Sequence, residues 1–349
     1  MLPSVIVSDT LRAAKRGEKR SHFNKVLLDR IGEALQAGSQ AILFQNRRGF
    51  SPYVECGHCG WTANCPDCNV SLTYHKSDGS LRCHYCGYRI PVPAVCPSCG
   101  TGSLLPRGFG TEKIEQELAA IFPEAAIDRL DADTSQSAGG YRRIVEAFEQ
   151  GRTDILIGTQ IVTKGFDFGG VSLVGILNAD NLLNYPDFRA GERAFQLMTQ
   201  VGGRAGRRSE PGTVVIQTAQ PQHPVIEQVL RGDYGAMVRS QLAERRAFFY
   251  PPYCRLIAVV MRHRDKELLW RAAGAFAESA REVFGRRLLG PEAPPVDRIR
   301  GRFLVRFLLK IERRSPSAEA KRLLQELFGR LHARAEFRSV EVAADVDPM

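Results

Sequence analysis

The sequence predicts an α/β fold with a parallel sheet, interrupted by a cysteine-rich insertion and followed by a smaller α+β domain. On both sides of the insertion, short aliphatic or β-branched runs alternate with segments of helical periodicity, which is typical of parallel α/β layers. Eight of the nine cysteines fall between Cys56 and Cys99. From Pro221 onward, the sequence pattern changes to that of helices followed by longer strands. The expected domains are 1–54 with 101–219 for the α/β part, 55–100 for the insertion, and 220–349 for a helical connection and the C-terminal domain.

Hydrophobic periodicity and turn residues give the expected elements. Ser21 is suited to cap a helix that runs to about Ala37, because its hydroxyl can accept a hydrogen bond from the first helical turn. In the α/β domain we expect strands at 40–45, 126–130, 154–157, 172–177 and 212–218, and helices at 111–122, 141–150 and 192–202. In the C-terminal domain we expect strands at 255–261, 298–311 and 338–343, helices at 266–284 and 317–333, and a stiff turn at 290–295.

The cysteines form four Cys-x-x-Cys pairs, each followed by a residue type that tolerates positive φ. The pairs are Cys56/Cys59, Cys65/Cys68, Cys83/Cys86 and Cys96/Cys99, and the following residues are Gly60, Asn69, Gly87 and Gly100. This spacing predicts two structural zinc sites rather than disulfides, because the chain shows no secretion signal. Four thiolates also leave no coordination position for water, which argues against a catalytic metal. His58, His75 and His84 are alternative ligands.

The segment between the second and third pairs predicts how the four pairs combine. Residues 70–75 and 81–82 favour strands, and the residues between them favour a turn. Such a hairpin would bring the third Cys-x-x-Cys pair close to the second. The expected inner site is Cys65, Cys68, Cys83 and Cys86, and the expected outer site is Cys56, Cys59, Cys96 and Cys99. A cross-braced pairing of the first pair with the third is the alternative.

The charge of the chain suits a nucleic-acid partner. Its formal net charge is +10 and its isoelectric point is about 9.3. From Gln222 to Met349 there are 24 Lys and Arg against 16 Asp and Glu, so most of the excess lies in the last third. No apolar run long enough to span a membrane occurs, and the first residues lack the pattern of a signal peptide. We therefore expect a cytoplasmic protein without a membrane partner.

Two further stretches resemble sites for anionic ligands. Residues 158–168 follow an expected strand, where open α/β sheets commonly bind ligands. Residues 200–207 end an expected helix, and their glycines hold Arg204 and Arg207 three positions apart, so that two cations can converge on one anion. The alternative interpretation is that these glycines end a helix and the arginines interact only with its dipole.

Together, these stretches resemble motifs V and VI of superfamily 2 helicases. With Asn46-Arg-Arg-Gly49, Gly108-Phe-Gly-Thr-Glu112 and the ending Asp345-Val-Asp-Pro-Met349, nearly the whole chain resembles the primosomal protein N′ family of bacterial replication-restart helicases. The resemblance implies a RecA-like helicase C-terminal lobe with the inserted two-zinc, eight-cysteine module, followed by the small α+β C-terminal domain. It also implies that Arg207 is an arginine finger on ATP, with Arg204 and Gln200 beside it.

The same resemblance implies further sites and partners. Asp167, with Gly165, is expected at the nucleotide, and Thr159 and Thr111 are expected to hold DNA phosphate. The implied partners are replication forks and other branched or single-stranded DNA, single-stranded-DNA-binding protein and primosome loading factors, and the chain is expected to be a monomer.

The sequence contains neither a Gly-x-x-x-x-Gly-Lys-Ser/Thr phosphate loop nor a magnesium motif. We expect half of a motor, truncated at Met1, which needs the rest of a longer protein for ATP and Mg²⁺ and is inactive by itself. The alternative function is a stand-alone zinc-ribbon protein that binds nucleic acid without motor activity.

The expected strand at 298–311 would separate its residues onto two faces. Ile299, Phe303, Val305, Phe307, Leu309 and Ile311 would share one face. Arg298, Arg300, Arg302, Arg306 and Lys310 would lie on the other, with alternate residues about 6.6 Å apart. We interpret this row, with Arg300, Arg302 and Arg306 at its centre, as a surface for DNA backbone or an acidic protein tail. The alternative is a solvated edge whose charges prevent pairing with other strands.

Overall fold

A computed structural model describes residues 3–45, 53–75, 78–107, 111–130, 138–159, 168–206, 211–313 and 317–348. These residues belong to two units. The first unit comprises Met1–Thr62, Pro93–Tyr185 and Arg189–Arg239. The second comprises Ala63–Val92, Pro186–Phe188 and Ser240–Met349. The cysteine-rich segment therefore contributes to both units.

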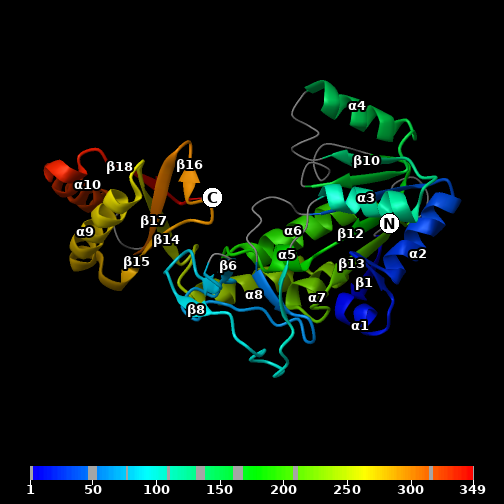
Figure 1. Ribbon diagram of the computed structural model, residues 1–349, viewed down its shortest axis with the longest axis horizontal. Helices are drawn as coiled ribbons and strands as arrows, with labels where there is room; N and C mark the ends of the chain where they lie inside the picture. The colour runs from blue at the N-terminus through cyan, green and yellow to red at the C-terminus, as the bar shows by residue number, and fades with distance from the viewer. Residues whose placement is uncertain are drawn as a thin grey trace. The chain divides into compact units, whose positions relative to one another are not determined.

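The first unit is built on a six-stranded sheet in the order β1-β13-β12-β4-β11-β10 (Figure 1). All of its strand pairs are parallel. The strands are β1 (Ser4–Asp9), β4 (Gln40–Phe44), β10 (Ile127–Leu130), β11 (Ile155–Gly158), β12 (Val171–Ile176) and β13 (Thr213–Thr218). The parallel α/β layer predicted from the sequence is confirmed. The expected strands and helices of this part agree with the observed ones to within a few residues, except that β1 was not expected and the first helix begins later.

Helices cover both faces of this sheet because alternate residues of each strand point to opposite sides. In β4 all five residues are buried: Ala41 and Leu43 pack with α2 (Lys25–Gln36) and α3 (Thr111–Ile121), whereas Ile42 and Phe44 pack on the opposite face. The helices of that opposite face include α4 (Ala138–Glu149), α6 (Ala190–Gly202) and α7 (Pro224–Arg231). Shorter helices are α1 (Thr10–Lys15) and α5 (Asp180–Leu183). Of the helices that the structure describes, none has the length and apolar character to cross a membrane.

The prediction that Ser21 caps α2 is wrong, because this helix begins at Lys25. Ser21 has a φ of 53° and lies in the turn between β2 (Lys19–Arg20) and β3 (Phe23–Asn24). The buried Gln217 holds the entry to the helix instead. Its Oε1 accepts a hydrogen bond from Asn24 N at 2.7 Å, and its Nε2 donates to the carbonyls of His22 and Leu177, both at 2.9 Å. A residue from β13 therefore replaces the local cap.

Short antiparallel strands occupy the cysteine-rich segment. In the first unit, β5 (Tyr53–Cys56) pairs with β9 (Leu104–Arg107). In the second unit, β6 (Thr73–His75), β7 (Ser80–Arg82) and β8 (Arg89–Pro91) form a three-stranded sheet. Thr73 lies opposite Arg82, which confirms the predicted hairpin; Lys76 and Ser77 in its turn lie outside the described residues.

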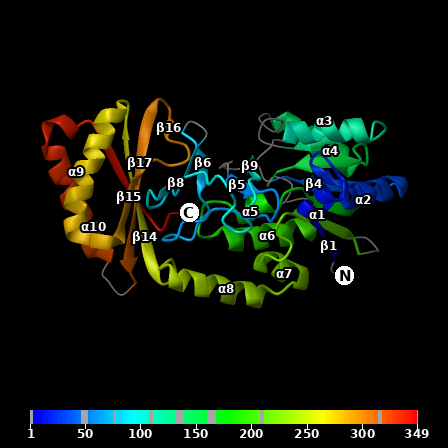
Figure 2. The same cartoon turned by 60° about the horizontal axis from the view of Figure 1, so that its bottom comes forward.

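The second unit contains an antiparallel sheet in the order β15-β17-β14-β18, with β16 paired to β17. Its strands are β14 (Cys254–His263), β15 (Leu288–Glu292), β16 (Arg298–Ile299), β17 (Arg302–Glu312) and β18 (Glu341–Val346). Two helices, α9 (Lys266–Phe284) and α10 (Ser317–Ala333), lie on one side of this sheet (Figure 2). The helix α8 (Tyr234–Ala247) precedes it in the chain. The prediction of a stiff turn at 290–295 is wrong for its first residues, because Gly290 belongs to β15.

The single strand expected at 298–311 is also wrong. Arg300 and Gly301 have φ values of 49° and 77° and reverse the chain, so that β16 folds back onto β17. Ile299 then lies opposite Arg302, which places it on the face assigned to the arginines. Of the five cations expected on the open face, two are exposed, two are half-buried and one is buried; they are Arg298 and Arg300, Arg302 and Arg306, and Lys310, respectively.

On the expected basic face, Leu304, Leu308 and Lys310 are 7%, 2% and 8% exposed. Arg302 pairs with Glu341, and the guanidinium of Arg306 lies 5.7 Å from the centre of the Tyr85 ring. The face does not form a continuous open row of cations. A DNA contact by Arg300, Arg302 and Arg306 stays a prediction.

Replacing Gln217 with Leu tests the buried anchor of α2. The substitution leaves the Asn24 amide and two carbonyls buried without their partner, so we expect the free energy of unfolding to fall by about 3 kcal/mol. Chemical denaturation of the chain measures the change. Gln36→Leu, at an exposed position on α2, is the control and should have little effect. Equal effects of the two substitutions would contradict the anchoring role of Gln217.

Candidate functional site

The eight clustered cysteines converge in two groups of four. Within each group, the sulfur atoms all lie within 4.8 Å of one another. The groups are Cys56, Cys59, Cys96 and Cys99, here the outer cluster, and Cys65, Cys68, Cys83 and Cys86, here the inner cluster. The structure therefore brings the pairs together in the nested order predicted from the hairpin, and the cross-braced alternative is wrong.

The sulfur separations fit a tetrahedral metal site. Sγ atoms lie close together in both clusters: those of Cys56 and Cys99 are 3.6 Å apart, those of Cys59 and Cys96 are 3.7 Å apart, and those of Cys65 and Cys86 are 3.6 Å apart. A tetrahedron with metal–sulfur bonds of about 2.3 Å has sulfur–sulfur edges of about 3.8 Å. A disulfide would need about 2.05 Å. The donor set and its spacing match a closed four-thiolate site.

All four Cys-x-x-Cys turns share one backbone conformation. The first cysteine of each pair accepts a hydrogen bond at its carbonyl from the amide of Gly60, Asn69, Gly87 or Gly100, at 2.8 to 3.0 Å. These four residues have φ values of 75°, 47°, 83° and 73°, as the sequence predicted. At the outer cluster, burial opposes ionisation of Cys56, whereas hydrogen bonds from the Thr101 hydroxyl and nearby amides lower the pKa of Cys56 to about 6. In the same turn, burial raises the pKa of Cys59 to about 12, so the hydrogen bonds favour the thiolate form of Cys56 in particular.

The histidines considered as ligands lie outside both clusters. His84 donates from Nδ1 to the carbonyl of Ala293 at 2.6 Å, and its Nε2 lies 3.3 Å from Nε2 of His75. Burial lowers the pKa of His84 to about 4, so this ring is neutral at neutral pH. His84 therefore serves as a hydrogen-bonding side chain of the second unit.

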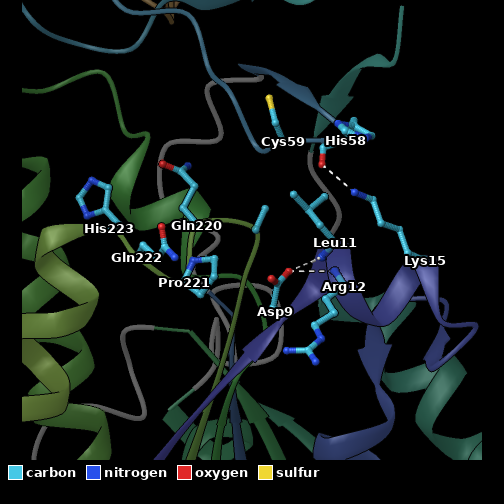
Figure 3. A pocket seen from close by; sticks show the side chains of 11 residues that line it. Asp9, Leu11, Arg12, Lys15, His58, Cys59, Gln220, Pro221, Gln222 and His223 are labelled. Atoms are coloured by element: carbon cyan, nitrogen blue, oxygen red, sulfur yellow. Dashed lines mark hydrogen bonds between the residues drawn. The ribbon is translucent and has the colours of Figure 1, made fainter. Parts of the chain in front are cut away.

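The outer cluster is attached to the end of the first unit's sheet. Gly60 lies so close to the strand end that a Cβ there would be 2.7 Å from the Ala219 carbonyl oxygen. Beside it, Lys15 Nζ donates to the carbonyl of His58 at 3.3 Å, and the Asp9 carboxylate accepts from the amides of Leu11 and Arg12 (Figure 3). These groups line a cavity of about 600 Å³ that also includes residues 219–223. The cavity lies where strands β1 and β13 end, and Arg12 and Lys15 make its lining basic.

The inner cluster is attached to the second unit. The Tyr250 hydroxyl donates to the carbonyl of Cys68 at 2.9 Å, and its ring stacks on Phe188 with centres 4.4 Å apart. Burial raises the pKa of Tyr250, so its hydroxyl remains a donor. Asn69 Nδ2 donates to the half-buried Glu244 of α8 at 2.7 Å. The Cys65–Cys68 turn is thereby held by hydrogen bonds with both Tyr250 and Glu244 of α8.

The carboxyl edge of the parallel sheet holds the residues expected at DNA. Thr159 directly follows β11, and Thr111 begins α3, which runs back toward the start of β10. Both side chains therefore lie at the edge where open α/β sheets bind ligands. Thr111 is 0% exposed and Thr159 is 5% exposed. The structure thus places both side chains at one edge of the sheet, and their contact with DNA stays a prediction.

The opposite, amino edge lies near two of the residues expected at ATP, Gln200 and Arg204. Gly206 N donates to the carbonyl of Val171 at 3.0 Å, which places the end of α6 beside the start of β12. Gln200 is exposed and Arg204 is half-buried on this segment. Arg207, Asp167 and Gly165 lie outside the described residues. Among the described residues, Thr159 therefore lies at the carboxyl edge, and Gln200 and Arg204 lie toward the amino edge.

Comparison with known families agrees with this arrangement. Residues 65–91 match the PriA DNA helicase Cys-rich region domain, residues 110–209 match the helicase conserved C-terminal domain, and residues 246–349 match the primosomal protein N C-terminal domain. This chain belongs to the PriA family. The RecA-like helicase lobe, the cysteine-rich module and the PriA C-terminal domain are therefore confirmed as its parts.

Curated relatives carry the name replication restart protein PriA. The relative from Bacillus subtilis is 37% identical over all of this chain, which covers 43% of that protein. The relative from Treponema pallidum is 41% identical over 93% of this chain, which covers 48% of that protein. The chain thus spans less than half of the length of these relatives.

Alanine substitutions at two turn glycines test how the outer cluster is held. Gly60→Ala and Gly100→Ala both place a side chain at positive φ, but only at Gly60 does the new Cβ meet a backbone oxygen. We expect Gly100→Ala to lower the free energy of unfolding by about 1 kcal/mol. Gly60→Ala should lower it by about 3 kcal/mol, because the turn must also move away from Ala219. Thermal unfolding followed by circular dichroism compares the two, and equal losses would contradict the close packing at Gly60.

Proposed function

We propose that this chain is the C-terminal part of an ATP-dependent 3′ to 5′ DNA helicase that recognises stalled or collapsed replication forks and restarts replication through primosome assembly. The observation that carries the proposal is the helicase C-terminal lobe combined in one chain with the PriA cysteine-rich region and C-terminal domain. A stand-alone zinc-ribbon protein is not favoured, since such a module needs no helicase lobe. The names of the curated relatives support the same function.

In this function the two edges of the parallel sheet have separate roles. Arg207 is the arginine finger on the γ-phosphate of ATP, with Arg204 and Gln200 beside it and Asp167 and Gly165 at the nucleotide. Of these, Arg204 and Gln200 lie toward the amino edge. At the carboxyl edge, Thr159 and Thr111 meet DNA phosphate, and the basic cavity at Arg12 and Lys15 extends this edge.

Because the sequence has no phosphate loop, ATP and Mg²⁺ are bound only with the rest of the longer protein, and this chain by itself neither hydrolyses ATP nor unwinds DNA. Single-stranded-DNA-binding protein and primosome loading factors are the proposed partners, and the protein is proposed to act in the cytoplasm as a monomer. The metal in both cysteine clusters is proposed to be zinc. Zinc accepts four thiolates in a closed tetrahedral site and stabilises the fold without taking part in the reaction.

Arg207→Ala tests the helicase assignment in a full-length protein that carries this chain. Losing a cation that acts on the transferring phosphoryl group should lower DNA-stimulated ATP turnover by roughly a thousandfold or more. Nucleotide binding, measured by titration with a fluorescent ATP analogue, should change much less. Arg16→Ala, at an exposed position on the same lobe, is the control and should retain turnover. Turnover that survives Arg207→Ala would contradict the assignment.

Metal analysis tests the zinc proposal and its pairing. Protein purified without chelator should contain two zinc ions per chain. Cys65→Ser and Cys86→Ser should both loosen one and the same ion, and Cys59→Ser should loosen the other. A zinc content of one or none would refute the two sites. Release of different ions by Cys65→Ser and Cys86→Ser would refute the nested pairing.

A further inference from the structure

Lys310 is a buried cation in the middle of β17. It is 8% exposed, and its ammonium group donates to the carbonyl of Phe248 at 2.8 Å and lies 3.8 Å from the centre of the Tyr250 ring. In the part of the chain that the structure describes, no carboxylate pairs with it. A buried ammonium group is strongly unfavourable unless an anion lies nearby. A carbonyl oxygen and a ring face supply only part of the required negative charge.

The inner cluster supplies the missing anion. Four thiolates around a divalent cation carry a net charge of about −2. Tyr250, which contacts Lys310 through its ring, donates its hydroxyl to the carbonyl of Cys68. Burial lowers the pKa of Lys310, and the negative charge of Cys68, with that of Cys254, Cys86 and Cys83, acts against that shift. The cation and the cluster therefore share one buried environment.

The segment that carries the inner cluster also covers the second face of the C-terminal sheet. Helices α9 and α10 lie on one side of β14 and β17, and β6 and β8 lie on the other (Figures 1 and 2). Arg306 of β17 lies over the Tyr85 ring, and His84 donates to the carbonyl of Ala293. A Cβ at Gly87 would lie 2.9 Å from the carboxylate of Glu292. Strands this short are not stable alone, so the metal must hold this layer together.

We infer that the inner metal is a folding ligand of the C-terminal domain, with Lys310 as its buried counter-cation, whereas the outer metal belongs to the helicase lobe. The inference rests on the zinc part of the proposed function and not on the helicase activity. Each metal then stabilises a different unit. Lys310 acts as a positioning residue, because it touches the tyrosine and the backbone rather than the metal.

Three substitutions test the role of Lys310. Lys310→Met keeps the length of the side chain without its charge, Lys310→Arg keeps the charge, and Lys321→Met is an exposed control on α10. Zinc release to EDTA, followed with a colorimetric zinc indicator, should be about 10 to 100-fold faster for one of the two ions in Lys310→Met. That ion should be the one that Cys65→Ser loosens. Lys310→Arg and Lys321→Met should release zinc much more slowly than Lys310→Met.

Equal release from Lys310→Met and the Lys321→Met control would overturn the inference. So would Lys310→Arg releasing zinc as fast as Lys310→Met, because the charge would then not matter. A chain that contains no zinc at all would refute the zinc proposal itself, and the initial metal content separates that result from a failure of the inference.

The two tryptophans report on the two units separately. Trp61 belongs to the first unit and Trp270, on α9, to the second. In a Trp61→Phe background, Trp270 fluorescence follows unfolding of the C-terminal domain alone. Removing the inner site with Cys65→Ser and Cys86→Ser should lower the midpoint temperature of the thermal unfolding transition reported by Trp270 by more than about 10 °C. Removing the outer site with Cys59→Ser and Cys96→Ser should leave it nearly unchanged. Equal shifts from the two removals, or no shift from the inner removal, would overturn the inference.

Discussion

The convergence of eight thiol groups into two clusters is the constraint on which the middle of this chain depends. Thiolates held within 4.8 Å of one another repel, so the arrangement is stable only with a cation at its centre. The surrounding strands have only three or four residues each and bury too little apolar surface to fold by themselves. In this segment, metal binding by the four Cys-x-x-Cys turns therefore supplies the stability that a hydrophobic core supplies elsewhere. Each cluster is joined to a larger unit that has its own hydrophobic core.

The parallel sheet imposes a second constraint, because all of its strands end at the same edge. Thr159 and the basic cavity at Arg12 and Lys15 lie at this carboxyl edge, and Gln200 and Arg204 lie at the amino edge. In the proposed function, the carboxyl edge serves DNA and the amino edge serves ATP.

The sequence predicts much of this structure, and its errors have identifiable physical causes. The nested cysteine pairing followed from local information, since turn residues between 75 and 81 favour a hairpin. Ser21 failed as a cap because Gln217, far away in the sequence, holds the start of α2. The strand at 298–311 failed because a single non-glycine residue, Arg300, adopts positive φ. The sequence placed Lys310 on an open face, and only the fold shows that it is buried against Phe248 and Tyr250.

The central claim is that both clusters are closed four-thiolate zinc sites. X-ray absorption at the zinc edge tests this claim most directly on the intact chain. We expect an average shell of four sulfur atoms at about 2.3 Å with no nitrogen or oxygen neighbours. A shell that contains nitrogen or oxygen in place of sulfur, or fewer than four sulfur atoms per zinc, would contradict it.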